Sequence, residues 1–70
     1  MLFSDKVKTL RLKKGLTQEE LAKLANVTQE AIHAYEKGKS KPFKNTQIQL
    51  AKVLNVKVDV LMNDELNIAE

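Results

Sequence analysis

The side chains best suited to bind a charged or polar ligand lie in one stretch of the sequence, between positions 18 and 44. Three lysines, Lys39, Lys41 and Lys44, fall within six residues. Gln29 and His33 precede them, and both side chains can donate and accept hydrogen bonds. A lysine run is usually a solvated loop, and a net charge of +3 suits either an ordinary surface or a polyanionic partner. These residues alone leave the ligand open.

The sequence contains few of the residue types that catalysis and metal binding require. It has no cysteine, so it can form no disulfide and no thiolate metal site. His33 is the only histidine, and Lys37 stands four positions on, where a second metal ligand would be needed. There is no glycine-rich phosphate loop and no carboxylate pair in an obvious pocket. We therefore expect no enzymatic activity, no metal and no cofactor.

Length and hydropathy predict one small soluble domain. A chain of 70 residues has room for a single core and buries only ~60% of its unfolded surface. Hydrophobic residues make up 43%, and no segment approaches the ~18 consecutive apolar residues of a membrane helix. The apolar start Met1-Leu2-Phe3 gives way at once to Ser4-Asp5-Lys6, unlike a signal peptide. We expect a cytoplasmic protein without a membrane partner.

Capping residues predict two short helices near the middle of the chain. Thr17 and Glu20 form a capping box at the start of a helix at about 18–25. Asn26 ends that helix, because Asn tolerates the left-handed conformation better than any residue except Gly. Thr28 caps the next helix, at about 29–37, after a turn of only about three residues. Two short helices joined so closely must cross steeply.

Three further helices are expected, one before this pair and two after it. The first runs from Asp5 to about Lys14, with Ser4 as its N-cap. Asn45 caps a fourth helix, which ends at Asn55. A short fifth helix follows around Val58 to Met62.

These elements predict an all-α fold of five helices, with the domain over 1–63 and a C-terminal tail over 64–70. Strand-like alternation is confined to 56–60, which is too isolated to pair. Leu24 and Ile48 are expected to face inward on their helices. The residues predicted to be buried are Leu10, Leu21, Ala22, Val27, Ile32, Tyr35, Ala51, Leu54 and Leu61.

A set of motif residues extends over almost the whole chain, from Val7 to Leu61. It comprises Leu10, Arg11, the run Gly15 to Ala22, Val27, Thr28, Ile32, the run Tyr35 to Gly38, Pro42, Leu50, Ala51, Leu54, Val56 and Leu61. In order and spacing the set resembles the lambdoid phage repressor and Cro family of helix-turn-helix proteins, also called the XRE family. Asn26 and Asn55 stand where that family usually has Gly, and Lys44 where an apolar residue is common. Neither departure threatens the fold.

The resemblance implies a compact five-helix domain of the phage repressor type that binds double-stranded DNA and regulates transcription, most readily as a repressor. The third helix would be the recognition helix in the major groove. A protein-interaction module of the same fold, such as an antitoxin, is the alternative. Acidic residues on the third helix would indicate it, and Glu30 is one. Gln18, Gln29 and the neighbouring lysines favour nucleic acid.

The outward side of the third helix carries the expected base-reading residues. Gln29 can hydrogen-bond to N6 and N7 of adenine, although a first-turn Gln can also be simply solvated. Glu30 can accept from cytosine N4, or its carboxylate can serve only the helix dipole. His33 is expected on DNA rather than on a metal. Ala34 offers a methyl group to thymine, or clearance for a close backbone approach.

The resemblance implies phosphate contacts from the starts of the second and third helices and from the loop after Gly38. Free amides at a helix N-terminus attract anions, and lysines add affinity without reading sequence. The phosphate-binding set is Gln18, Thr28, Lys37, Lys39, Lys41 and Lys44. The lysines expected only as solvated surface are Lys6, Lys8, Lys13 and Lys14.

Two further expectations concern contacts between protein groups. The resemblance implies an ion pair between Arg11 and Glu36 that joins the first helix to the end of the third. The C-terminal region also holds more apolar residues than one short helix can hide in its own domain, which favours a homodimer. The expected dimer interface consists of Val58, Val60, Leu61, Met62, Leu66 and Ile68.

Overall fold

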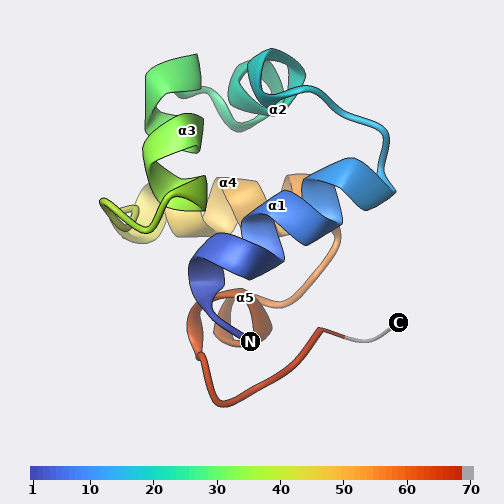
Figure 1. The fold of residues 1–70 in the computed structure, drawn as a ribbon, viewed down its shortest axis with the longest axis vertical. Coiled ribbons are helices and arrows are strands. Elements are labelled where there is room, and N and C mark those ends of the chain that lie inside the picture. Colours follow the sequence, from blue (N-terminus) through green and yellow to red (C-terminus); the bar gives the residue numbers. More distant parts are fainter. Residues whose placement is uncertain (69–70) are drawn as a thin grey trace.

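The computed structural model describes residues 1–68, which form five α-helices and no β-strand (Figure 1). In chain order the helices are α1 (Phe3–Lys13), α2 (Gln18–Ala25), α3 (Gln29–Glu36), α4 (Lys44–Leu54) and α5 (Val58–Met62). The predicted all-α fold is confirmed. Not one of the described helices is both long and apolar enough to cross a bilayer. Positions 69–70, the end of the expected tail, lie outside the described residues.

The predicted caps set the boundaries between α2 and α3. Thr17 Oγ1 accepts a hydrogen bond from the Glu20 amide at 3.0 Å, and the Glu20 carboxylate accepts one from the Thr17 amide at 2.8 Å. Asn26 ends α2 in the left-handed conformation, with φ of 60°. Thr28 Oγ1 accepts from the Ala31 amide at 3.1 Å and starts α3. The two helices meet through this tight turn at the top of the molecule (Figure 1).

The start of α1 differs from the prediction. The helix begins at Phe3 rather than Asp5, and Ser4 does not cap it. The Phe3 ring is buried in the core, and the Phe3 amide donates to Asp64 Oδ1 at 3.0 Å. A carboxylate from the far end of the chain therefore supplies the acceptor that the local sequence was expected to provide.

The start of α4 also lies earlier than predicted, and its N-cap position is occupied by Phe43 instead of Asn45. The Gln47 amide donates to the Phe43 carbonyl at 2.9 Å, so the helical ladder already begins there. No side chain caps this end. The other end of α4 agrees with the prediction, because Asn55 adopts the left-handed conformation with φ of 59°.

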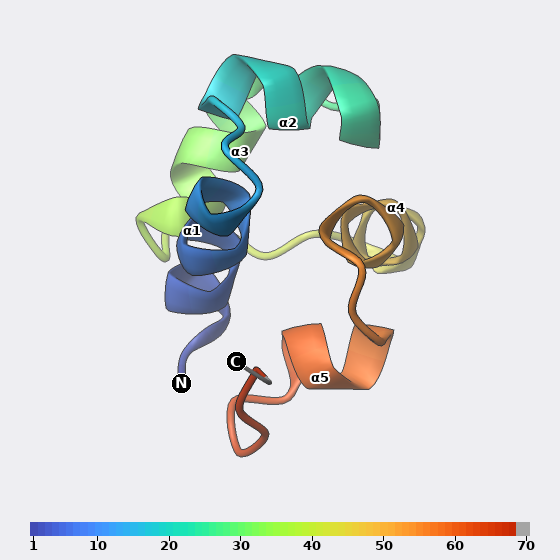
Figure 2. The ribbon, with the colours of Figure 1, turned by 90° about the vertical axis from the view of Figure 1, so that its right-hand side faces the viewer.

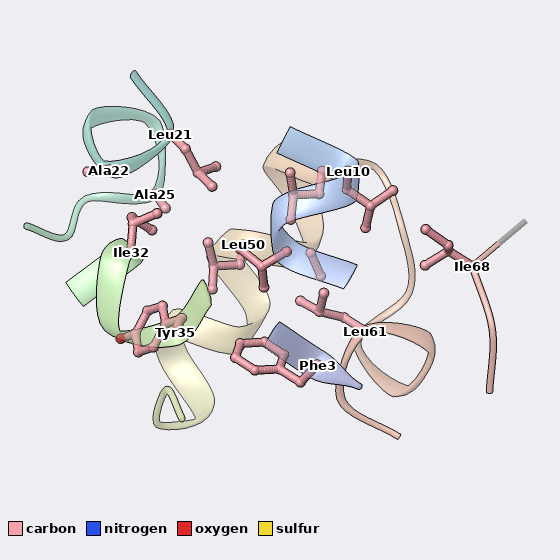
Figure 3. Close-up of a cluster of buried hydrophobic side chains, with 13 residues drawn as sticks. Phe3, Leu10, Leu21, Ala22, Ala25, Ile32, Tyr35, Leu50, Leu61 and Ile68 are labelled. Atoms are coloured by element: carbon pink, nitrogen blue, oxygen red, sulfur yellow. The ribbon is translucent and has the colours of Figure 1, made fainter. Parts of the chain in front are cut away.

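Thirteen buried hydrophobic side chains from all five helices and the tail form one core (Figure 3). They are Phe3, Val7, Leu10, Leu21, Ala22, Ala25, Ile32, Tyr35, Leu50, Ala51, Leu54, Leu61 and Ile68. The Phe3 and Tyr35 rings meet edge to face, with centroids 6.0 Å apart. Eight of the nine predicted core residues are in the cluster. The ninth, Val27, lies in the turn before α3 and is only half-buried against the core.

Two aliphatic side chains expected in the core are exposed instead. Leu24 is 57% exposed and Ile48 is 36% exposed. Each lies about 100° around its helix from the centre of the buried stripe, because successive residues are rotated by about 100°. The inward faces of α2 and α4 are therefore narrower than the apolar sequence pattern predicted.

Lys6 was expected as solvated surface and is completely buried. Its Nζ donates to the carbonyl of Val60 at 2.6 Å and to that of Asn63 at 2.7 Å. These acceptors lie at the end of α5, where the last carbonyls of a helix have no partner within it. The ammonium group therefore ties α1 to α5, which lies below α1 and α4 in Figure 2.

Candidate nucleic-acid interface

α3 turns one side into the core and the other to solvent. Ile32 and Tyr35 are buried on the inner side. The outer side carries the four expected base-reading residues, Gln29, Glu30, His33 and Ala34. The first three are exposed and the last is half-buried. Positions spaced by one, four and five residues share one side of a helix, so the four side chains form one continuous surface.

The end of α3 is fixed to α1 by the expected ion pair. Arg11 Nε lies 2.6 Å from Glu36 Oε2, and Arg11 Nη2 donates to Glu36 Oε1 at 3.1 Å. The remaining guanidinium nitrogen, Nη1, donates to the Leu16 carbonyl at 2.8 Å. The two side chains are only 10% and 4% exposed. A bidentate, buried pair of this kind fixes the orientation of α3 relative to α1.

Gln18 takes part in the same cluster, which the sequence did not reveal. Its Nε2 donates to Glu36 Oε1 at 3.1 Å, so the first residue of α2 is linked to the last residue of α3. A carboxamide nitrogen has two hydrogens, and the second remains available to a ligand. The contact therefore positions Gln18 without consuming its capacity to bind a phosphate.

The other expected phosphate-binding residues lie on the surface around α3. Thr28 is exposed at the start of the helix, and its hydroxyl, although it caps α3, can still donate its own hydrogen. Four exposed lysines follow the end of α3: Lys37, Lys39, Lys41 and Lys44. The sequence contains no acidic residue from position 37 to position 58. The loop between α3 and α4 is therefore strongly cationic.

This loop has a defined course. The Lys39 amide donates to the Ala34 carbonyl at 2.9 Å, which closes the end of α3. Gly38 makes the turn possible with φ of 73°, a conformation that few other residues adopt. Further on, Gln47 Nε2 donates to the carbonyl of the buried Pro42 at 3.0 Å. The lysines are thus presented by a loop that is anchored at both ends.

Residues 7–61 match the family model described as helix-turn-helix. This chain belongs to the helix-turn-helix family. Curated relatives include the HTH-type transcriptional regulator YqaE of Bacillus subtilis, which is 36% identical over 94% of this chain and 57% of YqaE. Another is the transcriptional repressor RstR of a cryptic CTXphi phage in Vibrio cholerae, 40% identical over 99% of this chain and 63% of RstR. The chain thus spans less than two thirds of the length of both relatives.

Solved structures of helix-turn-helix proteins have the same fold. The P22 c2 repressor in complex with a synthetic operator superposes with a TM-score of 0.88 and 25% identity, over 90% of this chain and 96% of that chain. SinR in complex with DNA gives a TM-score of 0.80 and 26% identity, over 86% of this chain and 97% of that chain. These matches confirm the phage-repressor fold that the sequence resemblance implied.

The six residues expected at a dimer interface of this helix-turn-helix domain separate into two groups. Leu61 and Ile68 belong to the core of the chain itself and are 0% and 8% exposed, so they are not available to a partner. Val58, Val60 and Met62 are half-buried, and Leu66 is 40% exposed. The tail holds more of its apolar surface within the monomer than the sequence indicated, because Ile68 folds back onto the core.

A shallow open groove lies beside the half-buried valines, between α4 and α5. Its apolar lining includes Ile48, Val56, Val58 and Val60. Lys52, Lys57 and Asp59 lie at the same groove, so both signs of charge accompany the apolar surface. The groove lies on helices other than α2 and α3, so it leaves the outer side of α3 free.

Proposed function

We propose that this helix-turn-helix chain binds double-stranded DNA at specific sequences and regulates transcription as a repressor, with α3 in the major groove. The observation that carries the proposal is the exposed row of Gln29, Glu30 and His33 on the outer side of α3. The buried Arg11–Glu36 pair holds that helix in place. The fold is that of a repressor solved on an operator, and a major groove admits one α-helix.

Base reading and phosphate binding belong to different residues in this proposal. Gln29 reads adenine with its carboxamide, and Glu30, His33 and Ala34 contact neighbouring base edges. The phosphates are bound by the residues around α3, namely Gln18, Thr28, Lys37, Lys39, Lys41 and Lys44. Their contribution is electrostatic and independent of sequence.

The proposal includes a homodimer that uses Val58, Val60, Met62 and Leu66. Two recognition helices related by a two-fold axis would then read half-sites roughly 34 Å apart, or a multiple of that distance.

The proposed function includes no enzymatic step, because the surface around α3 offers recognition groups and no nucleophile with a paired base. A regulator of transcription works where the chromosome lies, which in bacteria such as those of the relatives YqaE and RstR is the cytoplasm.

Selection of bound sequences from a random duplex library tests the proposed function. We expect one enriched, two-fold symmetric sequence, and binding to it that weakens steeply with salt. Analytical ultracentrifugation of the chain on that duplex should show two protomers. A library from which no sequence is enriched, with no salt-sensitive binding to any duplex, would support a protein-interaction module of the same fold instead.

A further inference from the structure

Phe43 is the most exposed large hydrophobic residue in the described part of the chain. Its side chain is 90% exposed, whereas the next highest value is 57%. Single apolar residues on a surface are common. This one occupies the N-cap position of α4, where Ser, Thr, Asp or Asn would accept a hydrogen bond from the first turn. A phenyl ring cannot do so, and therefore neither core packing nor capping accounts for Phe43.

The backbone that carries Phe43 is held on both sides. The preceding Pro42 is buried, and its carbonyl accepts from Gln47 Nε2 at 3.0 Å. The carbonyl of Phe43 itself accepts from the Gln47 amide at 2.9 Å. The ring therefore projects from a fixed point, and a ligand that contacts it has little backbone freedom to remove.

The surroundings of Phe43 favour an anionic partner. Lys41 lies two positions before it and Lys44 directly after it, and both are exposed. No acidic residue occurs over 37–58, and the carboxylate of Asp64, which lines the same surface pocket as Lys41, already accepts a hydrogen bond from the Phe3 amide. The loop and the start of α4 also lie on the same side of the molecule as α3 in Figure 1. A protein anchor would instead be expected within a larger apolar surface.

We propose that Phe43 is a DNA-contacting residue that packs against a deoxyribose of the backbone beside the half-site that α3 reads. The DNA backbone alternates anionic phosphates with less polar sugars, and in the sequence Phe43 stands between the exposed cations Lys41 and Lys44. The inference rests on the proposed DNA binding and extends it. Since sugars are the same at every step, the contact adds affinity for any duplex and releases no counterions.

Phe43→Ser tests this contact without weakening the fold, because Ser is among the best N-cap residues. The melting temperature should stay the same or rise. Burial of about 40 Å² of ring surface corresponds to roughly fivefold in affinity per half-site. On a mixed-sequence duplex of about 30 base pairs, long enough for two half-sites, we therefore expect the variant to bind roughly 25-fold more weakly as a dimer, or fivefold for each half-site. The dependence of the affinity on salt should not change.

Two control variants distinguish the ring from charge and from general surface effects. Lys44→Gln should make the salt dependence shallower by about 0.9 per lost phosphate contact. Leu24→Gln removes an exposed apolar side chain from α2 and should leave the affinity for DNA unchanged. A third variant, Phe43→Trp, supplies a direct probe of the contact. It should retain the affinity and change its fluorescence when the duplex is added.

The outcomes separate this inference from the proposed function. If the unmodified chain binds no duplex, the proposed function fails and the role of Phe43 fails with it. If the unmodified chain binds and Phe43→Ser binds equally well, only the role of Phe43 is overturned. Weaker self-association of Phe43→Ser with unchanged DNA affinity would assign the ring to a second copy of the chain. An indole fluorescence of the Phe43→Trp variant that DNA does not alter would also contradict the inference, whatever the stability of the Ser variant.

Discussion

Arg11 and Glu36 join the last turn of the first helix to the last residue of the third through two hydrogen bonds, at 2.6 and 3.1 Å. Glu36 also accepts from Gln18 at 3.1 Å, so one carboxylate connects α1, α2 and α3. No buried polar side-chain atom in the described residues lacks a partner. The position of α3 therefore depends on a satisfied polar cluster in addition to the apolar core.

Loss of the guanidinium should leave this carboxylate buried and underpaired. Arg11→Met is expected to lower the free energy of unfolding by about 3 kcal/mol, which urea denaturation would measure. The double variant Arg11→Met/Glu36→Leu should recover much of that loss, because no unpaired charge remains inside. A single-variant loss below ~0.5 kcal/mol, the worth of an exposed pair, would show that the cluster is solvated in solution.

The buried ammonium of Lys6 should also matter for stability. Lys6→Met keeps most of the apolar stem but removes the hydrogen bonds to the Val60 and Asn63 carbonyls. Bonds from a charged donor contribute about 1.5–3 kcal/mol each, so we expect a loss of at least about 2 kcal/mol in urea denaturation. Lys8→Met, at an exposed position on the same helix, should stay within about 0.5 kcal/mol. Equal effects of the two substitutions would contradict the buried contact.

The left-handed turn at Asn26 predicts that substitution by Ala and substitution by Gly affect the stability of the protein differently. Its φ of 60° is costly for a residue with a Cβ and costs glycine almost nothing. Asn26→Ala should therefore destabilise the protein by about 1 kcal/mol, whereas Asn26→Gly should match or slightly exceed the original stability. Thermal unfolding of the two variants in one buffer would show the difference. If Ala proved as stable as Gly, α2 would have to end in another conformation.

Features of the fold that depend on neighbouring residues could be predicted from the sequence. The Thr17–Glu20 capping box and the Asn26 turn each involve atoms within a few positions of one another, so local patterns were sufficient. The start of α1 could not be predicted in this way, because its acceptor, Asp64, lies 61 positions away. The burial of Lys6 could not be predicted for the same reason, since its carbonyl partners lie 54 and 57 positions away.

The candidate site shows the same division. The exposed row on α3 follows from helical periodicity once Ile32 and Tyr35 are placed inside. The contact between Gln18 and Glu36 depends on how α2 crosses α3, which the sequence does not specify. Phe43 had a visible signal, an aromatic residue between Pro42 and Lys44 in a basic loop. Its exposure could not be predicted, because it depends on α4 beginning directly after it with Phe43 as the N-cap.

If base reading and phosphate binding belong to different residues, substitutions of Gln29 and Lys41 should have different effects on DNA affinity and on sequence preference. Lys41→Ala should weaken binding to all duplexes alike and make the salt dependence shallower by about one unit per subunit. The ratio of affinities for the selected sequence and for random DNA should barely change. Neither side chain belongs to the core, so unchanged melting temperatures serve as the control for both variants.

Whether α3 reads DNA through Gln29 is decided by the sequence preference of Gln29→Ala, measured by repeating the duplex selection with the variant. We predict a loss of about 1–3 kcal/mol per half-site on the sequence that the unmodified chain prefers. Binding to random DNA should change little, and the preference should flatten at one base pair in each half-site. An unaltered preference in a variant that still folds would contradict the assignment of α3 as the helix that reads DNA through Gln29.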